Sequence, residues 1–342
     1  MTPLEIKHTL LPSEQYDFLR TNPHLGKNII LLGLGGSYAY GTNIETSDID
    51  IRGIAANTKD EILLGTTFEQ VIDETTDTTI YSLQKIVKLL TNCNPNTIEM
   101  LGLKPDQYLH LTDEGQMMID NRKIFLSKKA IQSFGGYANS QLRRLSNKTN
   151  EFVSQAKQEK HILASIENAR YTFSEKYFEH DSDAINLYID DAVNEEMDKE
   201  IFMDITLTHY PLRDYKAMWS EMHNIVKDYA SIGRRNKNAT LHAKLNKHAM
   251  HLIRLYLMAI DILEQQEIIT YREKEHDLLM DIRNGKYFTK DHQPTKEFNK
   301  LLDNLEKRFE KAKTITTLPD TPDYDKINNL VIQINENIVT NS

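Results

Sequence analysis

The N-terminal part of the chain alternates short apolar runs with polar turns, which is typical of a small sheet with helices. A short helical pattern over Ser13–Leu19 precedes the apolar run Asn28–Gly33, which predicts a buried strand. Polar and apolar residues alternate over Ser47–Gly53, which predicts a strand with its polar side chains on one face. Residues 68–80 add strand-like sequence, interrupted at residues 73–76.

Helical periodicity replaces strand periodicity further along the chain. Apolar residues at positions 83, 86, 87 and 90 predict a helix over Ser82–Leu90, ended by Asn94 and Pro95. Beyond residue 128, helical patterns cover residues 129–180, 184–205, 213–230, 240–265, 271–283 and 326–338, and only Ile268–Tyr271 resembles a strand. The sequence therefore predicts the α+β (α/β) class, with a small mixed-sheet domain over residues 1–128 and a mostly helical domain over residues 129–342.

Length and composition narrow the class of protein. The 342 residues fit two domains, since a domain takes on the order of 150 residues. No apolar run approaches the ~20 residues of a membrane span, and the first residues do not resemble a signal peptide. The single cysteine, Cys93, excludes an internal disulfide and a cysteine-rich zinc site. We expect a cytoplasmic protein without a membrane partner, and we expect Cys93 and Trp219 to lie in the core.

The charge of the chain is unevenly distributed. The net charge is −9, which argues against general coating of nucleic acid but allows a local basic groove. Residues 213–254 hold nine Lys and Arg against three acids, whereas residues 181–204 hold nine acids against one lysine. An anionic ligand is therefore expected to approach the first of these segments.

A glycine-rich turn and two aspartates carry the chemistry. Gly35, Gly36 and Ser37 follow the first predicted strand, and Asp48 and Asp50 come after a gap of ten residues. Carboxylates two positions apart on a strand project from one face, about 6–7 Å apart, so both can approach the same cations. Mg²⁺, or Mn²⁺ in its place, takes such oxygen ligands together with substrate phosphates. The turn N–H groups and the Ser37 hydroxyl are expected to bind the phosphates of a nucleoside triphosphate (NTP).

A two-metal site needs a further carboxylate that faces the attacking hydroxyl. We expect Asp77 to join Asp48 and Asp50 as the third metal ligand and catalytic residue, with Asp73 as the alternative. Arg52 alternates onto the face of Asp48 and Asp50, where a contact to a phosphate and a salt bridge are both open.

A basic stripe is predicted on the helix over residues 241–263. Lys244, Lys247, His248, His251 and Arg254 fall within about 120° of arc on a helix. Such a stripe suits nucleotide phosphates or an RNA backbone, and Lys244, Lys247 and His251 are the expected nucleotide-binding residues. A solvated helix face is the alternative. Zinc is not favoured, because the two histidines lack a third soft ligand.

The order of these motifs resembles the minimal signature of the DNA polymerase β nucleotidyltransferase superfamily. That signature is a glycine–serine turn followed, after about ten residues, by two aspartates separated by an apolar residue. More narrowly, the chain resembles the RlaP/YcgL-type nucleotidyltransferases, a bacterial and phage family linked to RNA repair. The matching stretches are Gly35–Thr42, Ser47–Gly53, Ile80–Lys85, Asn94–Pro95, Glu99–Leu101, Gly136–Ala138, Lys247–Arg254 and Asp281–Gly285.

The resemblance implies a Mg²⁺-dependent nucleotidyltransferase. Such an enzyme moves a nucleoside monophosphate (NMP) from an NTP such as ATP to an acceptor hydroxyl, here an RNA, and releases pyrophosphate. Transfer to a protein or a small molecule is one alternative, and a catalytically silent nucleotide or RNA sensor is another. The presence of Ser37, Asp48 and Asp50 argues against the silent sensor. The oligomeric state is left open.

Overall fold

The computed structural model describes residues 1–146, 185–191, 199–220, 241–289 and 293–341. The chain divides into two compact units, which are described separately here. Unit 1 comprises residues 1–138, 250–287 and 296–342, and unit 2 comprises residues 139–249 and 288–295. The domain boundary at residue 128 stays a prediction.

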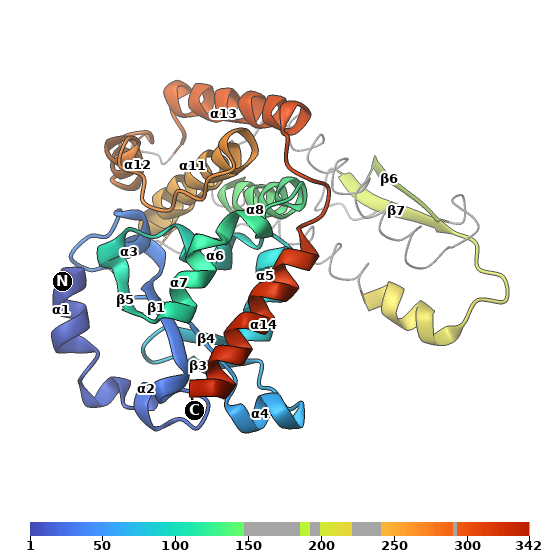
Figure 1. The fold of residues 1–342 in the computed structure, drawn as a ribbon. Coiled ribbons are helices and arrows are strands. Elements are labelled where there is room, and N and C mark those ends of the chain that lie inside the picture. The colour runs from blue at the N-terminus through green and yellow to red at the C-terminus, as the bar shows by residue number, and fades with distance from the viewer. Residues whose placement is uncertain (147–184, 192–198, 221–240, 290–292, 342) are drawn as a thin grey trace. The chain divides into compact units, whose positions relative to one another are not determined.

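A five-stranded mixed sheet forms the centre of unit 1 (Figure 1), as the sequence predicts. Its spatial order is β3–β4–β2–β1–β5, in which β2 and β4 run parallel and the other neighbours run antiparallel. The strands are β1 (Ile29–Leu34), β2 (Ile51–Ala55), β3 (Gln70–Asp73), β4 (Thr78–Ser82) and β5 (Tyr108–Leu111). The strand β1, which lies between β2 and β5, is buried along its whole length, which explains its continuous apolar run.

Short helices and turns cover this sheet. The N-terminal residues Ile6, Tyr16 and Leu19 belong to the same apolar cluster as Ile51 of β2 and Ile80 of β4. The short helices are α1 (Pro3–Glu5), α2 (Phe18–Thr21), α3 (Gly36–Tyr40), α4 (Lys59–Leu64), α5 (Leu83–Thr91), α6 (Pro95–Ile98) and α7 (Asp113–Asp120). A π-helical turn spans Ile6–Leu10, and 3-10 turns span Glu14–Tyr16, Gly26–Asn28, Glu99–Gly102, Pro105–Gln107 and Arg122–Phe125.

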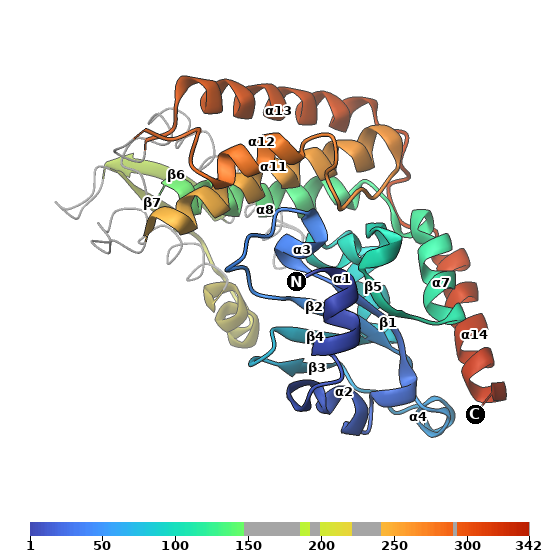
Figure 2. The ribbon, with the colours of Figure 1, turned by 90° about the vertical axis from the view of Figure 1, so that its left-hand side faces the viewer.

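Longer helices follow. They are α8 (Lys129–Ser146), α11 (Leu241–Gln265), α12 (His276–Arg283), α13 (Lys296–Ile315) and α14 (Tyr324–Asn341), and residues 212–220 are also helical. Tyr256 of α11 packs edge-on against Phe309 of α13, with ring centroids 5.7 Å apart. Figures 1 and 2 both show α14 beside α7, which it contacts together with α4. Within the described ranges, every helix is too short or too polar to cross a lipid bilayer.

In two stretches of the chain, the secondary structure differs from the prediction. Residues 184–205 were expected to be helical, but β6 (Ile185–Asp191) and β7 (Lys199–Ile205) pair as an antiparallel hairpin in unit 2. The reason is the alternation of Ile and Leu with polar residues, which favours a strand. The expected helix over Ser13–Leu19 is interrupted, because Glu14–Tyr16 is a 3-10 turn and α2 begins at Phe18.

The predicted strand around the two aspartates begins later than expected. β2 starts at Ile51, so Asp48 and Asp50 lie on the loop before it. In the β1–β2 ladder, the last pair is Leu34 with Ile51, because β1 ends there and the chain continues into α3. The predicted strand Ile268–Tyr271 does not form, although the Thr270 N–H donates to the carbonyl of Gly102.

Candidate active site

The glycine turn joins β1 to α3 and lies against the aspartate loop. The Gly35 N–H donates a 2.8 Å hydrogen bond to the Asp50 carbonyl, which extends the β1–β2 pairing by one step. Gly35 is the N-cap of α3, and Ser37 is buried in its first turn. The helix has only five residues, so a phosphate bound here would depend on individual N–H groups rather than on a helix dipole.

Gly36 holds the Asp50 side chain in contact with the turn. Its φ of +53° favours glycine, and a Cβ atom at this position would lie 1.8 Å from Asp50 Oδ2. The carboxylate therefore occupies the space that any side chain at position 36 would need. Asp50 is 21% exposed, whereas Asp48 is largely exposed. This contact explains why the sequence has glycine directly before Ser37.

Replacement of Gly36 by alanine is expected to displace the Asp50 carboxylate. A positive φ costs an alanine about 1–2 kcal/mol, and the collision adds to that loss of stability. If Asp50 is a ligand of a catalytic cation, a displacement of this size should lower activity about a hundredfold. Urea unfolding and a transfer assay would measure both effects.

Gly65 provides the matched control for this change. It has a φ of +67°, and a Cβ atom added there would have no other atom within 4 Å. Gly65→Ala should therefore lose stability through the backbone alone and keep full activity. Equal activity in the two variants would contradict a role for the contact between Gly36 and Asp50.

Arg52 links two of the candidate carboxylates. Its Nη2 lies 3.7 Å from Asp50 Oδ1 and 3.4 Å from Asp77 Oδ1. The two carboxylates therefore lie close to the same guanidinium nitrogen. Arg52 Nη1 donates a 2.7 Å hydrogen bond to the Asp77 carbonyl. The sequence left both a phosphate contact and a salt bridge open for Arg52, and the structure contains the salt bridges to Asp50 and Asp77.

The sheet register brings Asp77 level with Asp50. Ile51 pairs with Thr78 in the parallel β2–β4 ladder, and the Ile51 N–H donates to the Asp77 carbonyl over 3.2 Å. Asp77 sits in the turn before β4 with a φ of +47°, and its side chain is 57% exposed. The carboxylate is therefore next to Asp50 and accessible to a ligand.

Asp73 serves the turn between β3 and β4 instead. Its Oδ1 accepts hydrogen bonds from the Thr75 hydroxyl and from the N–H and hydroxyl of Thr76. These bonds lower the pKa of the Asp73 carboxyl, led by the bond from Thr75. The structure thus brings Asp77, rather than Asp73, toward Asp50.

The fit of the site to a divalent cation rests on its donors. Asp48 and Asp50 supply the hard oxygen atoms that Mg²⁺ and Mn²⁺ prefer. No group of three or more Asp, Glu, His or Cys suited to a metal occurs in the described part of the chain. The donors therefore fit a cation held by two carboxylates and completed by water and substrate phosphates, with Asp77 engaged by Arg52.

A buried network lies at the other end of α3. The Tyr40 hydroxyl donates to both carboxylate oxygens of Glu99 at 2.9 and 2.8 Å, and Arg254 Nη1 donates to Glu99 over 3.1 Å. The Arg254 guanidinium also stacks 3.6 Å from the centroid of the Tyr40 ring. Burial raises the pKa of Glu99, and Arg254 opposes that rise.

This network changes the picture of the basic stripe on α11. Arg254 belongs to the buried network, so it does not face phosphates. His251 contacts the Tyr40 ring edge-on at 5.9 Å, and His248 Nδ1 lies 3.0 Å from Gln141 Oε1 within unit 2. Lys247 is exposed on α11, and the side chain of Lys244 lies outside the described residues.

Sequence reasoning missed one cation at the aspartate loop. Arg283, in the last turn of α12, donates from Nη2 to the Ser47 hydroxyl over 3.0 Å, across 236 positions of sequence. Burial lowers the pKa of its guanidinium. The only signal in the sequence was its place within the matching stretch Asp281–Gly285.

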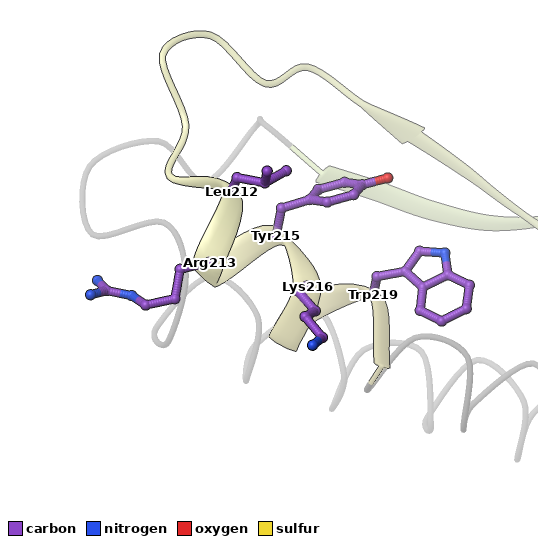
Figure 3. Close-up of a pocket in the computed structure, with 5 residues that line it drawn as sticks. All are labelled: Leu212, Arg213, Tyr215, Lys216 and Trp219. Carbon is purple, nitrogen blue, oxygen red and sulfur yellow. The ribbon is translucent and has the colours of Figure 1, made fainter.

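A helix of unit 2 presents aromatic and basic side chains to solvent. Tyr215 is 38% and Trp219 is 53% exposed, so the expectation that Trp219 lies in the core is wrong, whereas Cys93 is buried as expected. Figure 3 shows Leu212, Tyr215 and Trp219 extending to one side of the helix and Arg213 to the other. These residues, with Lys216, line a shallow pocket.

Comparisons with known proteins agree with this geometry. A protein of Enterobacteria phage T4, named an uncharacterized 38.9 kDa protein in the nrdC-mobD intergenic region, is 29% identical over 119 residues, which cover 31% of this chain and 35% of that protein. The chain therefore matches about a third of the length of this relative. No solved structure matches. The sequence profile of RlaP, the RNA repair pathway DNA polymerase beta family, matches residues 12–166, a span that contains the sheet, the glycine turn and Asp48, Asp50 and Asp77. Over these residues, the chain is similar to the RlaP family of polymerase β-type nucleotidyltransferases.

Proposed function

We propose that this protein transfers an NMP from an NTP to a hydroxyl of RNA, with Mg²⁺ or Mn²⁺ as the cofactor. The observation that carries the proposal is the contact between Gly36 and the Asp50 carboxylate. The contact supports the proposal because the turn that we propose for phosphate binding lies next to a carboxylate that we propose as a cation ligand. Similarity to a family linked to RNA repair supports the choice of RNA.

Each residue has a role in an in-line displacement. Asp48 and Asp50 would hold the cation, which would supply positive charge to offset that on the α-phosphate and the leaving group. Ser37 and the turn N–H groups orient the phosphates. The acceptor oxygen forms a bond to the α-phosphorus, the bond to the bridging oxygen of the β-phosphate breaks, pyrophosphate leaves, and the hydroxyl proton passes to solvent. Positioning and electrostatic stabilisation supply most of the rate.

Arg52 is suited to respond to the cation. In the described structure it neutralises Asp50 and Asp77 from one side. If Asp48 and Asp50 held a cation, Arg52 would still keep Asp77 oriented through its hydrogen bond to the Asp77 carbonyl. Asp77 is in this way available to the acceptor hydroxyl.

The aromatic and basic helix over residues 212–220 supports an RNA acceptor. Exposed Tyr and Trp side chains stack on unpaired bases, and Arg or Lys next to them bind the phosphate backbone. Tyr215 and Trp219 offer the stacking surfaces, and Arg213 and Lys216 offer the cations.

Label transfer tests the proposal directly. The protein is incubated with each α-³²P-labelled NTP in turn, Mg²⁺, and tRNA or nicked RNA. We expect label in nuclease-sensitive, acid-precipitable material, loss of transfer with a chelator, and recovery when Mg²⁺ or Mn²⁺ is restored. Label in protein or in a small molecule would replace RNA as the acceptor. Nucleotide binding without any transfer would favour a silent sensor.

A further inference from the structure

Arg283 carries a half-buried charge that pairs with no acidic side chain among the described residues. By contrast, the two fully buried arginines in the described part of the chain each have a carboxylate partner: Arg254 pairs with Glu99, and Arg272 pairs with Asp261. Arg283 is half-buried, and its contact is the neutral hydroxyl of Ser47. Its Nη1 is shielded from solvent and has no hydrogen-bond partner among the described residues.

A partly buried guanidinium without a charged partner is energetically unfavourable. Burial of a charge is unfavourable unless an opposite charge or a set of hydrogen bonds compensates it. A guanidinium nitrogen such as Nη1 carries two N–H donors, which suit the oxygens of a phosphate. An anion that bound here would therefore supply the missing partner. The residue as a whole is half-buried, so part of its side chain is open to a ligand, whereas Nη1 itself would have to turn toward that ligand to bind it.

The position of Arg283 selects the kind of anion. Ser47 directly precedes Asp48, and its hydroxyl accepts hydrogen bonds from both Arg283 and the Ile44 N–H. A simple anion near Asp48 and Asp50 would be repelled by their carboxylates. A polyphosphate that brings a divalent cation would be attracted by the carboxylates and by the guanidinium at once.

We propose that Arg283 binds the β- and γ-phosphates of the metal-bound NTP, and the pyrophosphate that they become. This inference rests on the proposed function, since it takes Asp48 and Asp50 as the cation ligands. Arg283 then stabilises the negative charge that develops on the leaving group. The bond to Ser47 fixes the guanidinium beside the loop that carries those ligands.

Direct titration of the full-length protein tests this role without an acceptor. Calorimetry would measure the affinity for magnesium pyrophosphate and for each NTP with Mg²⁺ in the wild-type protein and in Arg283→Met and Arg283→Lys. We expect Arg283→Met to weaken both about tenfold to a hundredfold, the range for loss of hydrogen bonds to a charged group. Arg283→Lys should recover part of that affinity, because it restores the charge without the planar fork.

Arg122→Met is the matched control. Arg122 is also half-buried, but it pairs with Glu267 at 3.6 Å, and Lys123 still neutralises Glu267 after the change. Its affinities should equal those of the wild type. Thermal unfolding of every variant identifies any that fail to fold, and Arg283→Gln serves as a second neutral variant in that case.

The outcomes separate this proposal from the function on which it rests. Equal affinity of the wild-type and Arg283→Met proteins for magnesium pyrophosphate would overturn it, even if NMP transfer is found. It is also overturned if the change raises KM for RNA alone, or if the wild-type protein binds neither probe. Arg283-dependent binding of pyrophosphate by a protein that modifies no acceptor would support it and count against NMP transfer.

Discussion

Asp50→Asn is expected to lower NMP transfer by about a thousandfold or more, because the change removes a charge that holds the cation. Asparagine has nearly the same shape, so it still fits the space beside Gly36 and can still accept from Arg52. The fold should therefore be preserved, and the thermal midpoint should stay close to that of the wild type. A single-turnover assay with labelled NTP would measure the loss.

Asp73→Asn tests whether a carboxylate outside the candidate site affects transfer. It changes a carboxylate that bonds to Thr75 and Thr76 of its own turn, so we expect lower stability and nearly unchanged transfer. Asp77→Asn should lower transfer without an equal loss of stability, since the Asp77 side chain is exposed. Transfer that survives in Asp50→Asn, or fails in Asp73→Asn while Asp77→Asn is active, would contradict the assignment of the carboxylates.

Arg254→Met is expected to have the largest effect on stability, about 3–5 kcal/mol in the free energy of unfolding. The change leaves the Glu99 carboxylate buried with only the Tyr40 hydroxyl and no cation. It also removes the stacking of the guanidinium on Tyr40. Urea unfolding of the wild type and the variant would measure the difference.

The loss should depend on pH in a defined direction. Burial raises the pKa of Glu99, and loss of Arg254 removes the main influence that lowers it. A carboxyl whose pKa is higher in the folded than in the unfolded state contributes stability below the unfolded value, and that stability is lost as pH rises through the folded value. Arg254→Met should therefore be closer to the wild type at pH 5 than at pH 8.

Two controls keep this prediction specific. The double variant Glu99→Gln with Arg254→Met should be more stable at pH 8 than Arg254→Met alone, since no charge is left buried. Arg308→Met breaks the ion pair with Glu264 at 48% exposure and should change stability by no more than about 1 kcal/mol. A pH-independent loss in Arg254→Met would show that packing, rather than the Glu99 charge, dominates.

Much of the fold was readable from local patterns. β1 is buried on both faces, and its sequence is therefore a continuous apolar run. α5 is buried on one face, and its apolar residues therefore follow helical spacing. The hairpin β6–β7 was missed because its acidic residues obscured a strand alternation. α13, which covers Lys296–Ile315, was not predicted, although its apolar residues Phe298, Leu302, Leu305 and Phe309 follow helical spacing.

In the candidate site, too, some features follow from the local sequence and others depend on the tertiary structure. The sequence by itself determined the α+β class and indicated the chemistry that we propose, through a glycine–serine turn and two aspartates at a spacing that suits cations and phosphates. Those features are local, so short-range geometry specifies them.

Only the tertiary structure decided which other residues join them. The parallel pairing of β2 with β4 brought Asp77 beside Asp50, and the packing of α12 brought Arg283 to Ser47. Burial took Arg254 out of the basic stripe and paired it with Glu99. These contacts depend on sheet order and on helix packing between distant segments, which no local period of the sequence encodes.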